Sequence, residues 1–491
     1  MKKVAIIGAG LSGLAAALRL SKAGFKVTVF EQNKTFGGKA GEIKESGFRF
    51  DTGPSLLTMP FVIDELLSLS SEDKIEFIRP EVLCRYFFSD KSVFDANSDL
   101  ESFIEKVSLM FGEPENNLRA YFIYAKNIYE LTADVFLFNK FSLKRILINN
   151  PLLFLKILQI DPFRTINSSL KRFFKNEKLI QFFGRYATYN GSDPYRAPAT
   201  LNIISWVENG LGGFYINGGM RRLPEIIYSK AAASGAEFIY EAPVISISQK
   251  QNSKVMLEYF KNGTRQEEVF DTVLSSIDVF KTEKMISGIK PSEISEPSTS
   301  AVIFFWGVKN TSAKMHLHNV LFSENYKKEF EDLRKGKVPG DPSVYIYISS
   351  KINLQDAPEK CENWFVMINT PSLANPQKFD YKNEIESLKL KILSKIKERT
   401  GINLKSKIIF EKIFTPNDIE SFTGSSLGSI YGNSSNSMFS AFRRKNSVSA
   451  KLKNLYYCGG TVHPGGGIPL VLLSAKIASE SIIKNLNGKS L

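Results

Sequence analysis

The stretch VAIIGAGLSGLAAALRLSKAGFKVTVFEQ, residues 4–32, decides the fold class of this chain. Its apolar, β-branched start predicts a buried strand of a parallel sheet, and its end predicts a second strand. Between them, Gly8 allows a tight turn, Gly10 lets the backbone approach a pyrophosphate, and Gly13 lets a helix pack closely on the strand. The pattern therefore predicts a dinucleotide whose phosphates lie at the N-terminus of that helix.

The residues that follow indicate which dinucleotide is bound. Glu31, at the tip of the second strand, is placed to accept hydrogen bonds from a ribose and disfavours a 2′-phosphate, which speaks against NADP. TFGGKAG, residues 35–41, then adds a glycine pair and the cation of Lys39, which suit a second part of a phosphate chain. An NAD-binding domain usually continues into another βαβ unit at this point, whereas this chain continues into FRFDTGPSLLT, residues 48–58. This layout favours FAD over NAD.

The composition indicates a globular protein with an anionic partner. A chain of 491 residues predicts two or three interleaved domains, and its 38 Phe residues suggest large apolar surfaces. A net charge of +14 favours nucleic acid, an acidic membrane surface or a phosphorylated ligand. The sequence contains no uncharged apolar stretch of about 18 residues, so no membrane-spanning helix is predicted.

Residues 139–178 concentrate the positive charge, with nine Lys or Arg against two acids. These cations are interleaved with ILINNPLLFLKILQI, and basic residues beside bulky apolar ones are typical of a segment that lies on a membrane. The alternative is a helical cap packed on the protein with a solvated basic face. Nucleic acid is not expected, because no binding module is recognisable. We expect a cytoplasmic protein that associates peripherally with the inner face of the membrane.

The histidines and cysteines are too few and too scattered to predict a metal site. Cys84, Cys361 and Cys458 form no CxxC pair, which argues against a disulfide framework or a zinc site and fits a reducing cytosol. His316 and His318 alternate as they would along a strand, so both could face one side. Two ligands do not make a metal site, and no metal is expected.

The second informative stretch is NLYYCGGTVHPGGGIPLVLLSAKIASESII, residues 454–483. It predicts a strand that ends in glycines, a turn too rich in glycine for packing alone, and a helix. The N-terminus of that helix points at whatever lies over residues 465–469. In a flavoprotein this would be the edge of the ring where negative charge develops on reduction, which a helix dipole stabilises.

With these motifs the chain resembles the bacterial carotenoid desaturases of the phytoene-desaturase family, within the flavin amine-oxidase-like superfamily. The matching motifs run from end to end: GAGLSGL, FGGKAG, FDTGPS, GGMRRLPE, LHNVLFSENY, DPSVYIYISS with DAPE, GSIYG and CGGTVHPGGGIPLVLLS. The last departs from the more usual G-A-G-T-H-P-G-A-G-x-P, since Gly460, Thr461 and Val462 precede His463 and three glycines follow Pro464. That variant is similar to the subgroup acting on 1-hydroxycarotenoids at carbons 3 and 4.

The resemblance implies an α/β fold and an FAD-dependent dehydrogenation of a long polyene. The expected architecture is a Rossmann-like FAD-binding domain of the glutathione-reductase type, interleaved with a mixed-sheet substrate domain and a helical, membrane-facing cap. We expect the FAD-binding domain to be discontinuous (1–70, 215–290 and 411–491), with the cap at 71–214 and the substrate-domain sheet at 291–410. The substrate is a carotenoid that reaches the protein from a bilayer, with residues 139–178 as the docking face.

The resemblance also implies the residues that contact FAD: Gly8, Gly10, Gly13, Glu31, Lys39, Ser55, Leu56, Val244, Gly460, Gly467, Ile468 and Pro469. Lys39 stands where Arg is more common, which would loosen a bidentate phosphate contact. For a catalytic acid or base the sequence is nearly silent. His463 is the candidate within the motif, with a role in ordering the turn as the alternative, and Arg49 and Asp51 are outside candidates.

Several alternatives stay open at the level of the sequence. Within the resemblance, they are phytoene or diapophytoene desaturation, or a carotenoid isomerase or oxygenase on the same scaffold. Outside it, the alternative is a flavin amine oxidase, which often attaches FAD covalently through a cysteine. Cys458 precedes the C-terminal glycines, but its setting in a predicted strand suits core packing better.

Overall fold

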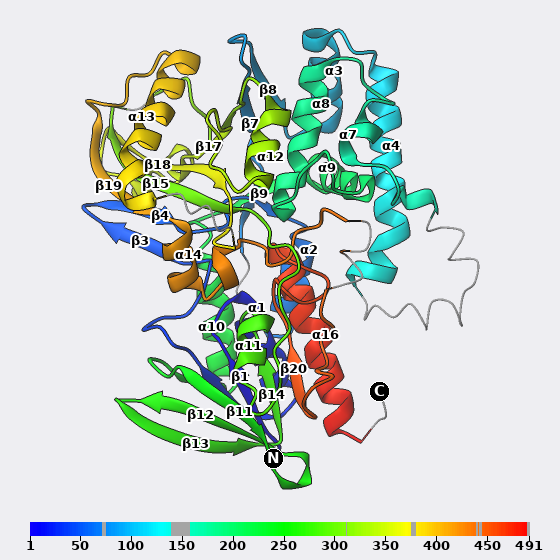
Figure 1. Ribbon diagram of the computed structural model, residues 1–491, viewed down its shortest axis with the longest axis vertical. Coiled ribbons are helices and arrows are strands. Elements are labelled where there is room, and N and C mark those ends of the chain that lie inside the picture. Colours follow the sequence, from blue (N-terminus) through cyan, green and yellow to red (C-terminus); the bar gives the residue numbers. More distant parts are fainter. Residues whose placement is uncertain are drawn as a thin grey trace.

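The computed structural model describes residues 1–70, 75–138, 158–310, 312–374, 380–437, 440 and 444–488. Figure 1 shows an elongated molecule, with one sheet and both termini in the lower half and a second sheet beside a group of helices in the upper half. Most of the basic and apolar segment predicted to contact a membrane, residues 139–157, lies outside the described residues.

The lower half is built on a five-stranded parallel sheet. Its strands lie in the order β10 (Glu237–Ile239), β2 (Lys26–Phe30), β1 (Lys3–Ile7), β14 (Thr272–Ser275) and β20 (Leu455–Tyr457). The helices α1 (Leu11–Lys22), α10 (Arg222–Ala233) and α16 (Ile468–Leu486) cover it, and α1 packs against the other two. The predicted strand, glycine turn, helix and second strand are confirmed, and so is the Rossmann-like topology.

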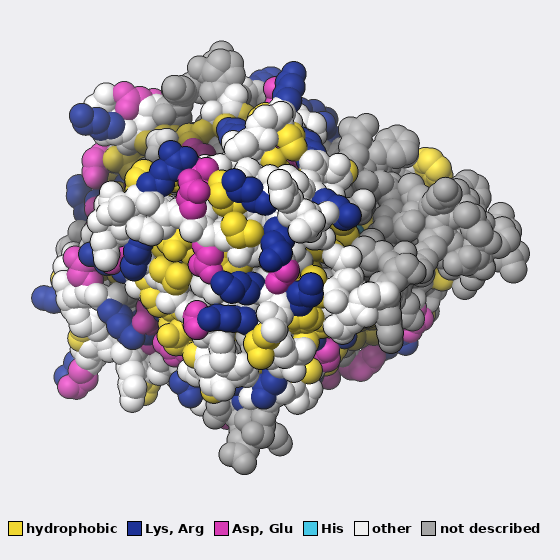
Figure 2. Space-filling view, turned by 90° about the horizontal axis from the view of Figure 1, so that it is seen from below, with side chains coloured by type: hydrophobic (Ala, Val, Ile, Leu, Met, Phe, Trp, Pro, Cys, Tyr) yellow, Lys and Arg dark blue, Asp and Glu magenta, His cyan; other side chains and the backbone are white. Residues whose placement is uncertain are grey.

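A small antiparallel sheet extends the lower end of the molecule. It consists of β11 (Val244–Gln249), β12 (Val255–Lys261) and β13 (Thr264–Phe270), and α11 (Val279–Lys284) follows β14. Figure 2 views the molecule from this end. On that face Lys and Arg side chains are interspersed with Asp, Glu and apolar side chains, so the visible part of this face carries no single-sign patch.

The upper half contains a seven-stranded mixed sheet. Its strands lie in the order β19 (Ile408–Phe414), β15 (Ser300–Lys309), β18 (Cys361–Thr370), β17 (Val344–Tyr347), β16 (His318–Leu321), β7 (Val82–Phe87) and β8 (Val93–Asn97). Only the β16–β7 pairing is parallel among these described strands. The predicted mixed-sheet substrate domain is confirmed, and it draws β7 and β8 from the range expected for the cap.

Both faces of this sheet are buried, which explains its nearly continuous apolar strands. On one face, Leu388 and Ile392 of α13 (Tyr381–Thr400) pack against Trp306 and Trp364. The other face belongs to the core that it shares with the lower half, where the rings of Phe50 and Phe305 meet edge to face.

The helices in the upper right of Figure 1 form a third, aromatic core beside this sheet. They are α3 (Leu100–Phe111), α4 (Glu115–Thr132), α7 (Ile166–Leu170), α8 (Glu177–Gly184), α9 (Ile203–Asn209) and α12 (Tyr326–Arg334). Tyr121 and Phe183 lie at its centre, with their ring centroids 4.5 Å apart. None of the helices in the described ranges is long and apolar enough to cross a bilayer.

Short elements join the two halves. They are the hairpin β3 (Glu42–Glu45) and β4 (Phe48–Asp51), the strands β5 (Leu57–Thr58), β6 (Phe77–Ile78) and β9 (Gly213–Ile216), and the helices α2 (Phe61–Leu67) and α14 (Pro416–Thr423). β9 pairs with both β5 and β6, although it lies far from them in the sequence. The chain thus returns to this junction after passing through the upper half. The loops that meet at this junction form the candidate site.

Candidate functional site

The junction lies at the carboxyl edge of the five-stranded sheet. β1 and β20 are strands of the same parallel sheet, so the helices that follow them, α1 and α16, both begin at this edge. Neither helix has a side-chain cap, because glycine occupies both N-cap positions. Two helix N-termini with free N–H groups therefore meet where ligands bind in open parallel sheets.

The glycine turn after β1 has the geometry that the sequence predicted. Gly8 adopts a φ of +95°, and a Cβ on Gly13 would lie only 2.1 Å from the carbonyl oxygen of Gly8. A Cβ on Gly10, by contrast, would meet nothing within 4 Å. Gly13 therefore sets the close packing of α1 on β1, while Gly10 faces open space.

The Glu31 carboxylate lies beside this turn and is buried. It accepts hydrogen bonds from the backbone N–H of Ala9 at 2.8 Å and from that of Asn33 at 2.9 Å. The carbonyl of Glu31 accepts the N–H of Ala242 at 2.9 Å, which brings the start of β11 and Val244 alongside. Each carboxylate oxygen keeps a lone pair for a further donor, such as a ribose hydroxyl.

The glycine pair Gly37 and Gly38 packs on the glycine turn that follows β1. The N–H of Gly37 donates to the carbonyl of Ala9 at 2.8 Å, and a Cβ on Gly38 would lie 3.2 Å from the Cα of Gly10. Arg221 holds this loop, since its guanidinium lies 4.3 Å from the ring of Phe36 and donates to the Phe36 carbonyl. Arg221 belongs to the GGMRRLPE motif, which carried no assigned role, and the motif is the signal that could have identified it.

Lys39 lies at the junction, directly after the glycine pair Gly37 and Gly38. Its Nζ donates to the carbonyl of Ile430 at 2.5 Å. The side chain is accessible to solvent, yet the surrounding protein desolvates it and lowers its pKa to about 8, with Asp278 acting in the opposite direction. Arg444 resembles it, because burial lowers its pKa to about 10 while its Nη1 donates to the carbonyl of Gly460 at 2.8 Å. Sequence reasoning missed Arg444.

The C-terminal glycine motif lies between β20 and α16, at the same edge of the sheet. Gly459 adopts a φ of +110° and donates to Ser474 at 3.1 Å, which docks the turn on α16. A Cβ on Gly466 would lie 2.9 Å from the ring of Tyr431, so this turn has no room for a side chain. Gly467 is the N-cap of α16, followed by Ile468 and then Pro469.

His463, the candidate acid or base in this motif, is buried against an aromatic ring. Its ring lies edge to face with Phe136, at 4.6 Å between centroids. Its backbone N–H donates to the carbonyl of Lys445 at 3.0 Å. Both contacts hold the turn in place, which fits the ordering role weighed as the alternative to a chemical one.

The outside candidates Arg49 and Asp51 form a buried ion cluster that joins the two halves. The guanidinium of Arg49 contacts Asp51 at 2.6 Å, Glu42 at 3.0 Å and Asp356 at 3.2 Å. Burial raises the pKa of Asp356, opposed by Arg49. Tyr347 donates to Asp51 at 3.0 Å. One cation thus holds the carboxylates of the β3–β4 hairpin together with that of the turn Leu354–Asp356, which is a structural role.

Ser55 and Leu56 lie on the loop between β4 and β5, where the cofactor edge meets the upper sheet. The hydroxyl groups of Ser55 and Tyr345 are 2.7 Å apart, and the Tyr345 hydroxyl is 2.7 Å from Nδ1 of His318. Leu56 lies next to Gly213 of β9. Tyr345 and His318 belong to quoted motifs, but sequence reasoning gave them no role at this site.

The two neighbouring histidines do not share a site. Burial lowers the pKa of His318 to about 3, and this residue starts β16. His316 precedes the strand, is half-buried, and lies 3.9 Å from a carboxylate oxygen of Asp95. The expectation that both could face one side is wrong, because the strand begins only at the second histidine. Within the described residues, no three His, Cys, Asp or Glu side chains come together as a metal site.

Cys458 is not placed to react. It is buried at the end of β20, and burial raises the pKa of its thiol to about 12. Its backbone N–H donates to the carbonyl of Ser275 at 2.9 Å, as in a continued strand pairing. A protonated, buried thiol is a poor nucleophile, so the core-packing interpretation holds.

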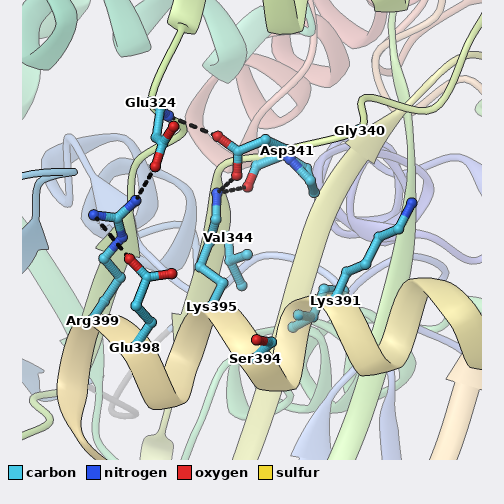
Figure 3. A pocket seen from close by; sticks show the side chains of 11 residues that line it. Glu324, Gly340, Asp341, Val344, Lys391, Ser394, Lys395, Glu398 and Arg399 are labelled. Carbon is cyan, nitrogen blue, oxygen red and sulfur yellow. Dashed lines mark hydrogen bonds and ion pairs between the residues drawn. The ribbon is translucent and has the colours of Figure 1, made fainter.

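A separate hollow of about 210 Å³ lies far from this junction, between α13 and the loop that precedes β17. Figure 3 shows that Lys395 and Asp341 point toward one another, as do Arg399, Glu324 and Glu398, whereas Lys391 points away from them. Lys395 pairs with Asp341, and Arg399 lies 3.4 Å from Glu324. Most of the charges that line this hollow are therefore paired with each other.

The donor set at the junction fits a dinucleotide. Two uncapped helix N-termini and Lys39 suit a diphosphate, and the carboxylate of Glu31 suits a ribose. The structure brings together the predicted glycines of both motifs, Glu31, Lys39 and the loop of Ser55 and Leu56 at one edge. Val244 begins β11, and it lies near Glu31 because the N–H of Ala242, two residues earlier, donates to the carbonyl of Glu31.

Comparison with known proteins agrees with this site. Residues 11–301 match the family described as flavin containing amine oxidoreductase. The chain is 44% identical to a 1-hydroxycarotenoid 3,4-desaturase from Flavobacterium sp. (strain P99-3), over 99% of this chain and 100% of that protein. It is 31% identical to a 4,4'-diapolycopene oxygenase from Methylomonas sp, over 99% of both chains. A solved structure of putrescine oxidase shares the fold, with a TM-score of 0.64 at 14% identity over 99% of both chains.

Proposed function

The chain belongs to the flavin containing amine oxidoreductase family and, within it, to the carotenoid desaturases, and on that basis we propose that it catalyses the 3,4-desaturation of a 1-hydroxycarotenoid. It is an oxidoreductase, and its cofactor is FAD. The observation that supports this substrate is the 44% identity over the full length of a 1-hydroxycarotenoid 3,4-desaturase. A 4,4'-diapophytoene desaturase from Staphylococcus haemolyticus reaches 28% over a similar length.

We assign the cofactor to the carboxyl edge of the five-stranded sheet. The N–H groups at the start of α1 receive the phosphates, Lys39 neutralises their charge, and Glu31 holds a ribose. The N-terminus of α16 faces the flavin end. When bound, FAD supplies the acceptor for a hydride taken from the substrate. The residues assigned to it are Gly8, Gly10, Gly13, Glu31, Lys39, Ser55, Leu56, Val244, Gly460, Gly467, Ile468 and Pro469.

The protein's own contribution is orientation and the exclusion of water. His318 is neutral near pH 7, because its pKa is lowered to about 3, and Cys458 is protonated, because its pKa is raised to about 12. His463 is packed against Phe136. His318 and Cys458 are thus uncharged near pH 7, and the chain lowers the barrier by holding one C–C bond at the junction in an apolar surrounding.

We further propose that the protein takes its substrate from the inner face of a membrane, through residues 139–178. The described part of this segment leaves Phe163 68% exposed. The side chains of Arg164, Lys171 and Arg172 nearby are 51–52% exposed. These cations also contact the carboxylates of Asp161 and Glu177. An exposed ring in the same segment as exposed cations suits a bilayer with anionic headgroups.

A flavin amine oxidase is the alternative from another class. It draws on the solved structures, which share the fold at 13–14% identity and so speak for architecture alone. The buried thiol of Cys458 speaks against a covalent flavin link through that residue. The full-length identity to carotenoid enzymes favours a polyene substrate.

The test is conversion by purified protein with FAD in liposomes. An acyclic 1-hydroxycarotenoid, the same carotenoid without its hydroxyl, and phytoene are supplied separately, and absorption spectra follow the length of conjugation. We expect a red shift with the hydroxylated substrate alone. A shift with phytoene would replace this proposal by phytoene desaturation, and oxidation of an amine without any polyene conversion would replace it by amine oxidation.

A further inference from the structure

Three polar side chains form a continuous hydrogen-bond chain at the boundary between the cofactor edge and the upper sheet. Nδ1 of His318 lies 2.7 Å from the Tyr345 hydroxyl, which lies 2.7 Å from the Ser55 hydroxyl. His318 is 3% exposed and packs flat against the ring of Tyr347, with 5.3 Å between centroids. Tyr345 and Ser55 are only half-buried, so the chain runs from the core toward the junction.

The direction of these hydrogen bonds, from donor to acceptor, follows from the protonation of the His318 imidazole. Burial keeps His318 neutral, so one ring nitrogen carries a hydrogen and the other a lone pair. Nε2 is buried and has no hydrogen-bond partner among the described residues. An orphaned buried N–H is rarer than an orphaned acceptor, so the hydrogen belongs on Nδ1. His318 then donates to Tyr345, Tyr345 donates to Ser55, and the O–H of Ser55 remains a donor at the junction.

The chemistry of the proposed substrate places an alcohol close to the bond that reacts. In a 1-hydroxycarotenoid that is desaturated between carbons 3 and 4, the hydroxyl oxygen is four single bonds of about 1.5 Å from carbon 4. It therefore lies within about 5 Å of the bond that reacts at the cofactor. An alcohol so close to the cofactor loses its hydration when the substrate binds. If the protein does not replace the lost hydrogen bond, the affinity for the substrate falls.

We propose that the Ser55 hydroxyl donates a hydrogen bond to the 1-hydroxyl of the substrate, with Tyr345 and His318 as positioning residues that hold Ser55 as a donor. This inference rests on the proposed function and specifies how its substrate is selected. The backbone of Ser55 and the side chain of Leu56 stay with the cofactor wall, while the Ser55 side chain turns toward the substrate.

The test compares hydroxylated and non-hydroxylated polyene on the FAD-loaded enzyme. Ser55→Ala is expected to lower kcat/KM for the hydroxylated substrate roughly ten-fold relative to that for the non-hydroxylated one, which is the effect of one lost hydrogen bond on the preference. The loss is expected in KM. Tryptophan-fluorescence quenching by each polyene in vesicles measures the same preference in binding, and the flavin content of each variant is measured alongside.

The positioning residues are tested by rescue. His318→Leu removes the donor to Tyr345. Like Ser55→Ala, both His318→Leu and Tyr345→Phe are expected to lose the preference for the hydroxylated polyene. His318→Asn keeps a donor near the place of Nδ1 and is expected to restore most of it. Tyr121→Phe is the control, because it likewise removes a phenol hydroxyl, one that donates to Ser205 at 2.8 Å in the helical core.

The outcomes separate this inference from the proposed function. If the wild-type enzyme converts neither polyene, the proposed function fails. If it converts the hydroxylated polyene and Ser55→Ala keeps the full preference, the inference alone is overturned. If Ser55→Ala instead loses its flavin while the preference of the remaining holoenzyme is intact, the Ser55 side chain belongs to the cofactor and the inference is overturned as well.

Discussion

At the scale of single residues, the site depends on charges that the surrounding protein desolvates in part. Lys39 is the clearest case, because it is accessible to solvent and still has a lowered pKa. A desolvated cation interacts more strongly with an anionic ligand than a hydrated one does. Desolvation therefore disfavours the charged lysine in the apoprotein and strengthens its interaction with a bound phosphate. The lysine, standing where arginine is usual, adds a dependence on pH that an arginine would not show.

We predict that FAD affinity falls as the pH rises through about 8. Burial holds the pKa of Lys39 at about 8, below its ordinary 10.5, and a bound phosphate returns it toward that ordinary value. Binding therefore takes up a proton between these limits, so the affinity is full below pH 8. Above it, the dissociation constant is expected to rise by up to about ten-fold per pH unit. Titration of the apoprotein with FAD, followed by flavin fluorescence, measures it.

Two variants show whether Lys39 is the titrating group. Lys39→Met is expected to bind FAD more weakly below pH 8 and to lose most of the pH dependence. Lys34→Met is the control, since the Lys34 side chain is 87% exposed and pairs with Glu241 on the surface. An unchanged slope in Lys39→Met would contradict the assignment.

At the scale of elements, the turn between β1 and α1 separates packing from ligand binding. Gly13 has no room for a Cβ, because the carbonyl of Gly8 would lie 2.1 Å away. Gly10 has open space in front of it and a φ of −73°, which any residue adopts. The two glycines of one motif therefore serve different purposes, although sequence spacing treats them alike.

We predict that Gly13→Ala and Gly10→Ala have different effects. Gly13→Ala forces α1 away from β1 and is expected to destabilise the apoprotein by about 1–3 kcal/mol, with loss of FAD binding. Gly10→Ala is expected to leave thermal unfolding of the apoprotein nearly unchanged, and to weaken FAD binding because its Cβ enters the ligand space. Calorimetry and flavin titration measure both. Equal destabilisation by the two variants would refute the distinction.

At the scale of the whole molecule, the site is made where two sheets meet, and its opposite ends face different surroundings. The five-stranded sheet supplies the cofactor edge, and the seven-stranded sheet and the helices supply the apolar side. The face in Figure 2 mixes both signs of charge. The exposed ring of Phe163 and the cations near it lie instead beside the helices, next to the segment of highest charge.

We predict that membrane binding depends on this region. Replacing Arg164, Lys171 and Arg172 together by Gln is expected to weaken binding to anionic vesicles roughly ten- to hundred-fold, with little effect on neutral vesicles. Phe163→Ser is expected to weaken binding to both. Flotation of the protein with liposomes at low salt measures these effects.

The matched control is Leu390→Ser, since Leu390 is 53% exposed on α13, at the other side of the molecule in Figure 1. It is expected to float like the wild type. If the wild type bound neutral and anionic vesicles equally, the electrostatic part of the proposal would be wrong.

The sequence by itself determined the parts of this protein that depend on local geometry. The spacing of Gly8, Gly10 and Gly13 predicts the turn and the helix after it, because steric limits on φ and on Cβ act between near neighbours. The C-terminal glycines likewise predict the start of α16. Together with the family, these motifs predicted the Rossmann-like sheet and FAD, and both predictions are confirmed.

Only the tertiary structure decided which distant residues share a site. Arg49 and Asp356 are 307 positions apart in the chain and 3.2 Å apart in space, and Ser55 and Tyr345 are 290 positions apart. The motifs that contain them were visible, but no periodicity relates them, since their contacts arise where the β3–β4 hairpin and the loop after it dock on the upper half. Burial then sets their charge states, because desolvation depends on every atom around a group and not on its neighbours in sequence.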